Sequence, residues 1–475
     1  MLLVNAVAPL SVLLAVPHNP QAADSCLSQY YYGTHGQQDV FITTDELCLS
    51  ESASLFSEGS FVPLSQDGQQ QQQLVWLQHE AVDPAIKPAT FVDEIDAFLS
   101  HLPTGPVPST DAASGEQVVI GAHKSGAELL HRTAESALIS VDPTTVLTLD
   151  QHLPRFWRAS PLPTSPVPFI PVPDEAVARV RDILSHLKFD PVVSSLVNNI
   201  SVPQLRADVR YLTGESPRSE IVSRHSFSQG VLIAAKWLKE TFEELGAQCE
   251  LKPFLSGFAP NVICSYAGSE RTTETVLISA HYDSRGSFGS VRAPGGDDDG
   301  SGTTALLGIA RTIARRGVRF RKNVQLCAFA GEEQGLYGSR YYAQELRQKG
   351  ANLTLMVQAD MLAYHAPGEP AQLGLPDRIG TPEVTQLVAN LSAIYSPELT
   401  VGFTPACCSD HQSFHGQGFP ATQVFERAGP IADPMYHNSG DLSERDNYDF
   451  DQIKSIAKFA TLLHVAGFDL DEGDE

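Results

Sequence analysis

The chain has 475 residues, of which 42% are hydrophobic and 19% are charged, and its formal net charge is −24. This composition supplies enough apolar side chains for a large core. A surface of this charge repels nucleic acid and anionic membranes, and no basic run offsets it. We therefore expect neither nucleic acid nor a membrane as a partner.

Two short apolar runs, residues 1–8 and 10–16, open the chain. Each is too short to span a bilayer, so residues 1–23 predict a signal peptide and a secreted, extracellular protein. The positive charge usual in such a segment is missing, because the first basic residue is Lys87. A buried, apolar N-terminus is the alternative. Three glycosylation sequons favour secretion only weakly; they lie at Asn199, Asn352 and Asn390.

The next region, residues 24–152, has a loose composition with a glutamine run at 69–73. Apolar runs at 116–122 and 144–150 predict strands, and residues 126–138 predict a helix. We interpret this region as a small α+β propeptide-like unit. Residues 153–173 follow and contain seven prolines, which favour an extended linker.

Seven cysteines are too few for a dense disulfide framework in a chain of this length. Cys26 with Cys48 and Cys249 with Cys264 are plausible pairs. Cys327 lies in an apolar run and is expected to be a core thiol. The sequence leaves the state of the adjacent Cys407 and Cys408 open.

Helical and strand-like segments alternate regularly from residue 174 to the end. Continuous apolar runs, typical of strands buried on both faces, occupy residues 274–280, 323–330, 354–360 and 421–426. Amphipathic segments predict helices at 174–187, 229–246, 302–317, 337–350 and 381–395. The alternation favours an α/β fold: a three-layer sandwich with a mostly parallel central sheet and helices on both faces.

Polar side chains follow these predicted strands. In open α/β sheets, ligands bind beyond the carboxyl ends of the strands. Any one carboxylate there could simply cap the next helix, but several together repel one another unless a cation lies among them. Imidazole and carboxylate together suit zinc. The residues concerned are His281, Asp283, Asp297–Asp299, Glu332, Glu333, Asp360 and, after a loop, His437.

The spacing of His281 and Asp283 has a further meaning. At a strand end, residues i and i+2 point the same way, so Asp283 can accept the second ring N–H of a metal-bound His281. A rival pair, His411 and His415, has the i, i+4 spacing of helical zinc ligands, but Gln412 stands where such a motif needs its glutamate. No G-x-S-x-G nucleophile motif occurs.

Five ordered motifs identify a resemblance to a known family. "SAHYDS", "APGGDDDGSG", "FAGEEQGLYGS", "QADM" and "HNSGD" resemble the secreted microbial leucyl-type aminopeptidases, two-zinc metallopeptidases of the bacterial leucyl aminopeptidase type. The resemblance covers about residue 173 to the C-terminus, including a helix expected at 446–467. In one departure, Thr404 replaces the first cysteine of a Cys-x-x-x-Cys bridge that some members carry.

The resemblance implies a role for each residue of the cluster. His281 and Asp360 would bind one zinc ion, Glu333 and His437 the other, and Asp298 would bridge both. Glu332 would be the catalytic general base, and Asp283 would orient His281. A cis peptide bond between Asp298 and Asp299 is also implied.

We therefore expect a secreted di-zinc aminopeptidase that hydrolyses N-terminal residues from peptides with a metal-activated water. We expect residues 174–475 to form its catalytic domain, and the molecule to be made as a zymogen and to be a monomer. A carboxypeptidase or a single-zinc glutaminyl cyclase on the same fold is the alternative. A non-catalytic binding module is a third reading, although such modules usually lose ligands.

Overall fold

The computed structural model describes residues 11–55, 59–64, 72–87, 94–102, 109–110, 117–118, 127–287 and 290–470. The chain divides into two compact units. Residues 1–79 and 88–169 form the first, and residues 80–87 and 170–475 form the second. No helix in the described ranges is long and apolar enough to cross a membrane.

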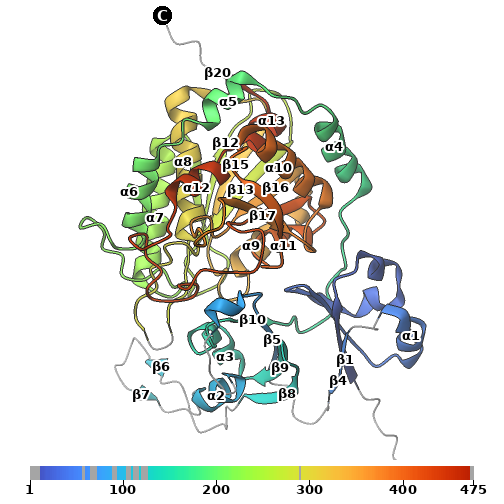
Figure 1. Ribbon diagram of the computed structural model, residues 1–475. Coiled ribbons are helices and arrows are strands. Elements are labelled where there is room, and N and C mark those ends of the chain that lie inside the picture. The colour runs from blue at the N-terminus through green and yellow to red at the C-terminus, as the bar shows by residue number, and fades with distance from the viewer. Residues whose placement is uncertain are drawn as a thin grey trace, which may run out of the picture. The chain divides into compact units, whose positions relative to one another are not determined.

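Two four-stranded antiparallel sheets dominate the first unit (Figure 1). One has the order β2-β3-β1-β4, from Tyr31–His35, Gln38–Thr43, Ser11–Pro17 and Ser60–Leu64. The other has the order β10-β5-β9-β8, from Trp157–Pro161, Gln73–His79, Ser136–Val141 and Glu128–Arg132. The unit also contains a short pair, β6 (Ser109–Thr110) and β7 (Gln117–Val118), and the helices α1 (Glu46–Glu51), α2 (Glu94–His101) and α3 (Pro143–Val146).

Two predictions for this unit are wrong. The helix expected at 126–138 is the hairpin of β8 and β9, because the Thr133 hydroxyl accepts the N–H of Ser136 (2.9 Å) and reverses the chain. The strand expected at 144–150 begins as helix α3, which Asp142 caps by accepting the N–H of Thr144 (2.8 Å). Of the strand expected at 116–122, Gln117–Val118 form β7 and the rest lies outside the described residues.

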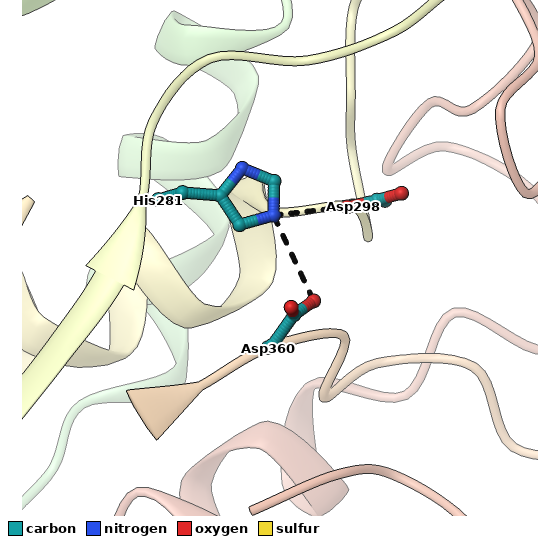
Figure 2. A group of neighbouring side chains, drawn as sticks. All are labelled: His281, Asp298 and Asp360. Atoms are coloured by element: carbon teal, nitrogen blue, oxygen red, sulfur yellow. Dashed lines mark ion pairs between the residues drawn. The ribbon is translucent and has the colours of Figure 1, made fainter. Parts of the chain in front are cut away.

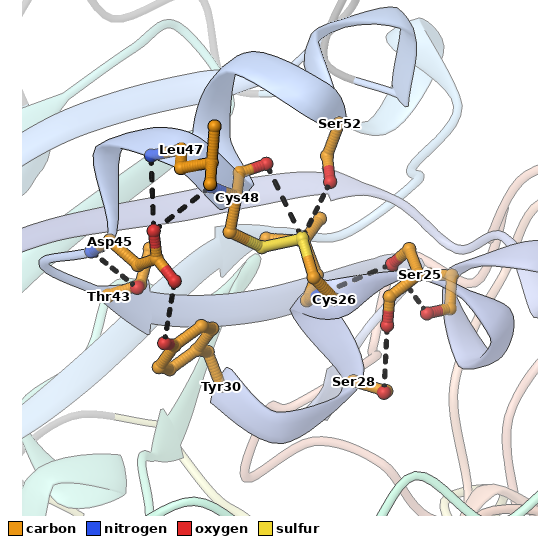
Figure 3. Close-up of a disulfide and its surroundings, with 11 residues drawn as sticks. Ser25, Cys26, Ser28, Tyr30, Thr43, Asp45, Leu47, Cys48 and Ser52 are labelled. Carbon is orange, nitrogen blue, oxygen red and sulfur yellow. Dashed lines mark hydrogen bonds between the residues drawn. A yellow bond between two sulfur atoms is a disulfide. The ribbon is translucent and has the colours of Figure 1, made fainter.

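The apolar run of the expected signal peptide forms strand β1 from Ser11 onward. It is buried and pairs with both β3 and β4, which corresponds to the buried-N-terminus alternative; the signal peptide stays a prediction. Figure 3 shows the Cys26–Cys48 disulfide of the first unit and its surroundings. There Asp45 caps α1 through the N–H groups of Leu47 and Cys48.

The second unit is built on a six-stranded sheet of order β11-β12-β15-β13-β16-β19. Its four strands from β15 to β19 are parallel, and β11 and β12 are antiparallel additions at one edge. The strands are Gln248–Lys252, Asn261–Tyr266, Asn323–Phe329, Thr275–His281, Leu353–Ala359 and Ala421–Val424. Smaller pairs are β14 (Val318–Phe320) with β20 (Phe468–Leu470) and β17 (Gln372–Pro376) with β18 (Thr400–Thr404).

Helices cover both faces of this sheet (Figure 1). One face packs on α5 (Pro191–Val197), α6 (Val202–Leu212), α7 (Gln229–Glu244), α8 (Gly300–Arg316), α10 (Pro382–Tyr395), α12 (Phe450–Ile456) and α13 (Ala460–Ala466), with α4 (Asp174–Ser185) beside them. The other packs on α9 (Tyr337–Gln348) and α11 (His411–His415). The predicted sandwich, with its parallel core, is confirmed. The helix expected at 446–467 is broken into α12 and α13.

The expected disulfides are both present. Cys249 and Cys264 join the antiparallel strands β11 and β12. Cys407 and Cys408 are bonded to each other, and Cys327 is a buried free thiol.

The boundary between the units lies at residues 169 and 170, inside the expected linker. That linker is extended, but Trp157–Pro161 forms strand β10. Residues 80–87, although early in the sequence, pack in the second unit. The N–H of Asp83 donates to Ile431 O (2.7 Å), the N–H of Ile431 donates to Ala81 O (2.8 Å), and Asp83 pairs with Arg427.

Candidate metal centre

His281 and Asp360 stand at the carboxyl ends of the adjacent parallel strands β13 and β16. Figure 2 shows one ring nitrogen of His281 facing both Asp360 and Asp298, and Asp298 comes from the loop before α8. Nε2 of His281 lies 3.2 Å from a carboxylate oxygen of Asp298 and 3.8 Å from one of Asp360. All three residues are buried. Two strand ends and a loop that are distant in sequence therefore bring three ligand-type side chains into one enclosed group.

A second group shares Asp298 with the first. Nε2 of His437 lies 3.3 Å from the other oxygen of Asp298 and 3.0 Å from Glu333. In each group one ligand-type atom per residue lies within 4.8 Å of the others. Oε1 of Glu333 is buried and makes no hydrogen bond. Two adjoining sets of donors therefore meet at a single bridging carboxylate.

Asp283 connects His281 to the turn that carries the two glutamates. Its Oδ1 lies 3.5 Å from Nδ1 of His281. The backbone N–H groups of Glu332 and Glu333 donate to its two oxygens, each at 3.3 Å, and the Ser226 hydroxyl donates at 2.9 Å. Glu332 is buried beside the groups without belonging to either.

The three aspartates of the loop before α8 have separate partners. Asp299 accepts the N–H of His281 (3.0 Å) and caps α8 through the N–H of Gly302 (2.8 Å). Asp297 accepts the N–H of Ala363 (2.8 Å). Only Asp298 turns toward the ligand groups, and its peptide bond to Asp299 is cis, as the resemblance implies. Asp297 and Asp299 thus hold backbone N–H groups, and Asp298 belongs to the candidate metal site.

The charges of the site call for a cation. Burial alone would lower the pKa of His281, but the surrounding carboxylates, Glu332 first, raise it well above its ordinary value. Burial opposes the ionisation of Asp298, yet contacts with His281 and His437 lower its pKa. Both shifts favour positive charge on the imidazoles beside the carboxylates. Metal ions would supply it instead, because they bind deprotonated ligands, and the donor set fits zinc.

Sequence reasoning missed the polar residues that support this site. Asp441 accepts the N–H groups of Asp297 and Asp298 and is paired with Arg445. Arg224 is fully buried and donates to the carbonyls of the same loop. Of these supporting residues, only Asp441 lies in a motif that the sequence analysis singled out, "HNSGD". The rival His411 and His415 lie on α11 and belong to neither ligand group that the described residues form.

The chain is similar to known peptidases in sequence and in fold. Residues 261–462 match the model of peptidase family M28. A probable leucine aminopeptidase of Trichophyton verrucosum is 30% identical over 285 residues, covering 57% of this chain and 74% of the relative. Leucine aminopeptidase 1 of Metarhizium robertsii is 27% identical, covering 54% and 68%. The LapA aminopeptidase of Legionella pneumophila has a TM-score of 0.56 at 17% identity, covering 83% of this chain and 98% of LapA.

The fold and the two buried donor groups are those of a metallopeptidase. The chain belongs to peptidase family M28, and its sequence is similar to leucine aminopeptidases. The likeness to LapA supports the fold alone.

Proposed function

We propose that this chain is an aminopeptidase that works with two zinc ions. The observation that carries the proposal is the sharing of Asp298 by two buried groups of ligand type. His281 and Asp360 would hold one ion. Glu333 and His437 would hold the other. Ions bound there polarise the scissile carbonyl and lower the pKa of water.

Glu332 is the proposed general base. It is buried at the centre, while its neighbour Glu333 contacts His437. Its backbone N–H is held by Asp283, which fixes the turn from which the side chain leaves. A carboxylate placed there takes a proton from the attacking water and delivers it to the leaving amine.

Asp283 is proposed to act through His281 and through the turn that carries Glu332 and Glu333. Its Oδ1 lies 3.5 Å from Nδ1 of His281, on the side from which a carboxylate would hold the proton on that nitrogen and leave Nε2 for a metal ion. Its oxygens also hold the turn of Glu332 and Glu333. This carboxylate therefore fixes the proposed metal ligand His281 in position relative to the proposed base Glu332.

Peptides with a free N-terminus are the proposed substrates. The named relatives are leucine aminopeptidases, and a net charge of −24 favours approach of a cationic N-terminus over a polyanion.

The test uses the purified full chain and the same chain after cleavage in the linker at residues 153–173. Hydrolysis of aminoacyl-nitroanilides is compared with that of the N-acetylated compounds and of N-blocked peptides, and the metal content is measured. We expect two zinc ions per chain, hydrolysis only with a free amine, and loss of activity with a chelator. Release of C-terminal residues from blocked peptides, or cyclisation of N-terminal glutamine without hydrolysis, would contradict the proposal.

The N-terminal region is proposed to be a propeptide of a secreted, monomeric enzyme. Disulfides are typical of oxidising compartments, and each unit contains one that joins cysteines distant in sequence. Residues 24–152 would be separated from residues 174–475 by a cut in the linker. Deglycosylation of the secreted protein tests the sequons at Asn199, Asn352 and Asn390, and light scattering tests the monomer.

A further inference from the structure

Arg224 is a fully buried residue behind the candidate metal centre and outside both ligand groups. Its side chain donates four hydrogen bonds to backbone carbonyl oxygens. Nε donates to Tyr282 (2.8 Å) and Nη2 to Gly295 (2.7 Å), while Nη1 donates to Pro294 and to Leu212 (3.3 Å). One guanidinium therefore ties together three segments of the chain.

Two of those segments carry residues of the site. Tyr282 lies between His281 and Asp283, and Gly295 precedes Asp298 by three residues. The backbone of Arg224 reinforces the connection: its N–H donates to Ala293 O (2.9 Å), and its carbonyl accepts the N–H of Ser284 (3.2 Å). The end of β13 and the loop before α8 are thus both attached to this residue.

The loop fits closely around the guanidinium. Gly295 has a φ of +56°, and a Cβ there would lie 2.8 Å from Nη2 of Arg224 and 2.4 Å from the carbonyl oxygen of Asp298. Such a site needs glycine. It also needs the planar, forked donor of arginine, because the single ammonium of lysine cannot reach carbonyls on separate segments in these directions.

The charge of Arg224 is used as well. Burial lowers the pKa of its side chain, while Asp441, Asp299 and Asp283 raise it. None of these three carboxylates belongs to a ligand group. The guanidinium therefore lies among acidic residues that stand outside the two ligand groups.

We infer that Arg224 is a positioning residue for the metal centre. It sets the separation between the strand end that carries His281 and the loop that carries Asp298, and through this separation it sets the affinity for metal. The inference rests on the proposed function, since it takes these two residues to be metal ligands.

The test compares two substitutions with a matched control. Arg224→Lys keeps the charge and loses the fork, and Arg224→Gln loses the charge and keeps two N–H donors. Arg311→Lys is the control, because Arg311 on α8 makes a forked ion pair with Asp208 on α6. Zinc affinity is measured on the full chain by competition with a chromogenic chelator, alongside the melting temperature of the metal-free protein and the absorption spectrum with Co²⁺.

We expect both Arg224 variants to bind zinc about 10–100-fold more weakly, the range found when outer partners of metal ligands are removed. Their Co²⁺ spectra should shift. Arg311→Lys should bind zinc like the unaltered protein, even where its melting temperature falls. A variant of Arg224 that folds only with metal present also supports the inference.

Two results overturn the inference. One is unaltered zinc affinity and Co²⁺ spectra in both Arg224 variants. The other is failure of both to fold with and without metal while Arg311→Lys folds, which would give Arg224 a role in folding alone. Failure of the unaltered chain to bind two ions would instead contradict the proposed function.

Discussion

The carboxylate of Asp441 accepts the backbone N–H of Asp298, with 3.0 Å between Oδ2 and the nitrogen. It also accepts the N–H of Asp297 (2.9 Å) and forms an ion pair with Arg445 (3.0 Å). Arg445 in turn makes two bonds to Asp433. The bridging loop is therefore held by the segment that follows His437, so two parts of the candidate centre are fixed to each other.

Replacing Asp441 tests this connection. Asp441→Ala leaves two buried N–H groups unpaired, each costing about 1–3 kcal/mol, and Asp441→Asn should recover part of that loss. The free energy of unfolding in urea, measured with excess chelator, gives the cost. The exposed Asp451 offers a control, since Asp451→Asn should change stability by less than about 0.5 kcal/mol. Equal stability of Asp441→Ala and Asp451→Asn would show that the contact contributes nothing.

Glu332 and Glu333 should respond differently to the same substitution. Glu332→Gln removes the proposed base, so turnover should fall by about 10²–10⁴-fold or more while two zinc ions remain bound. Glu333→Gln removes a proposed ligand, so zinc content should fall together with turnover. Metal analysis and kinetics on both variants decide the assignment, and the opposite pattern of zinc loss would reverse it.

His365 should make the stability of the fold depend on pH. Burial alone would lower its pKa, but Asp449 and the carbonyl of Glu369, at 2.8 and 2.7 Å from its ring nitrogens, raise it. A raised folded-state pKa gives stability that is complete below the unfolded value of about 6.5 and is lost as pH rises through the folded value. The stability difference between the unaltered chain and His365→Asn should therefore shrink with rising pH.

Unfolding in urea at several pH values measures this difference. Asp449→Asn is the control variant, because asparagine can still cap α12 but lacks the charge that raises the histidine pKa. In that background the pH dependence attributed to His365 should be much weaker. A stability difference that grows with pH would contradict the prediction.

The Cys249–Cys264 disulfide should stabilise the second unit through its edge strands. The two cysteines are 15 residues apart and lie opposite each other in β11 and β12. Closing a loop of this length is worth about 3 kcal/mol in the chain-entropy model. Replacing both cysteines with serine should lower the melting temperature of the unit that binds metal. Replacing Cys26 and Cys48 should leave that transition unchanged, which calorimetry can check.

The proposed activating cut should fall within residues 163–166. Trp157–Pro161 is protected in strand β10, and the N–H groups of Leu162 and Val167 are bonded to Leu74 and Tyr31. Residues 164–166 between them are exposed. N-terminal sequencing of the active enzyme locates the cut. A fully active chain that begins near Ala23 and keeps this region would exclude the propeptide, and would also require the first unit to fold without β1.

The parts of the molecule that the sequence predicted correctly rest on local signals. Continuous apolar runs located β13, β15, β16 and β19, and the residues that follow β13 and β16 do meet at one edge of the sheet. Where a local signal conflicted with long-range pairing, the prediction failed. Residues 126–138 are predicted from the sequence to be one helix, but residues 136–141 form the strand β9 because β5 and β8 pair with its two edges.

The residues that support the site, Arg224 and Asp441, could not be predicted from the sequence for a similar reason. Arg224 bonds to carbonyls up to 71 positions away, and Asp441 to N–H groups 144 and 143 positions away. Nothing in their immediate neighbours indicates such partners. Backbone groups leave no trace in the residue types of the segments that supply them, so these contacts could be found only in the folded chain.

Residues 80–87 belong to the second unit, although in the sequence they lie between the two parts of the first unit. A single cut in the sequence therefore cannot separate the two units. An expression fragment that starts at Pro173 would lack Val82 and Asp83, uncover Ile431, and leave Arg427 with one of its two carboxylate partners among the described residues, Glu369. Natural processing by a single cut in the linker would keep them. The mature enzyme would then consist of a light and a heavy polypeptide held together without a covalent bond, and a second cleavage or a dissociation step would be needed to free the heavy one.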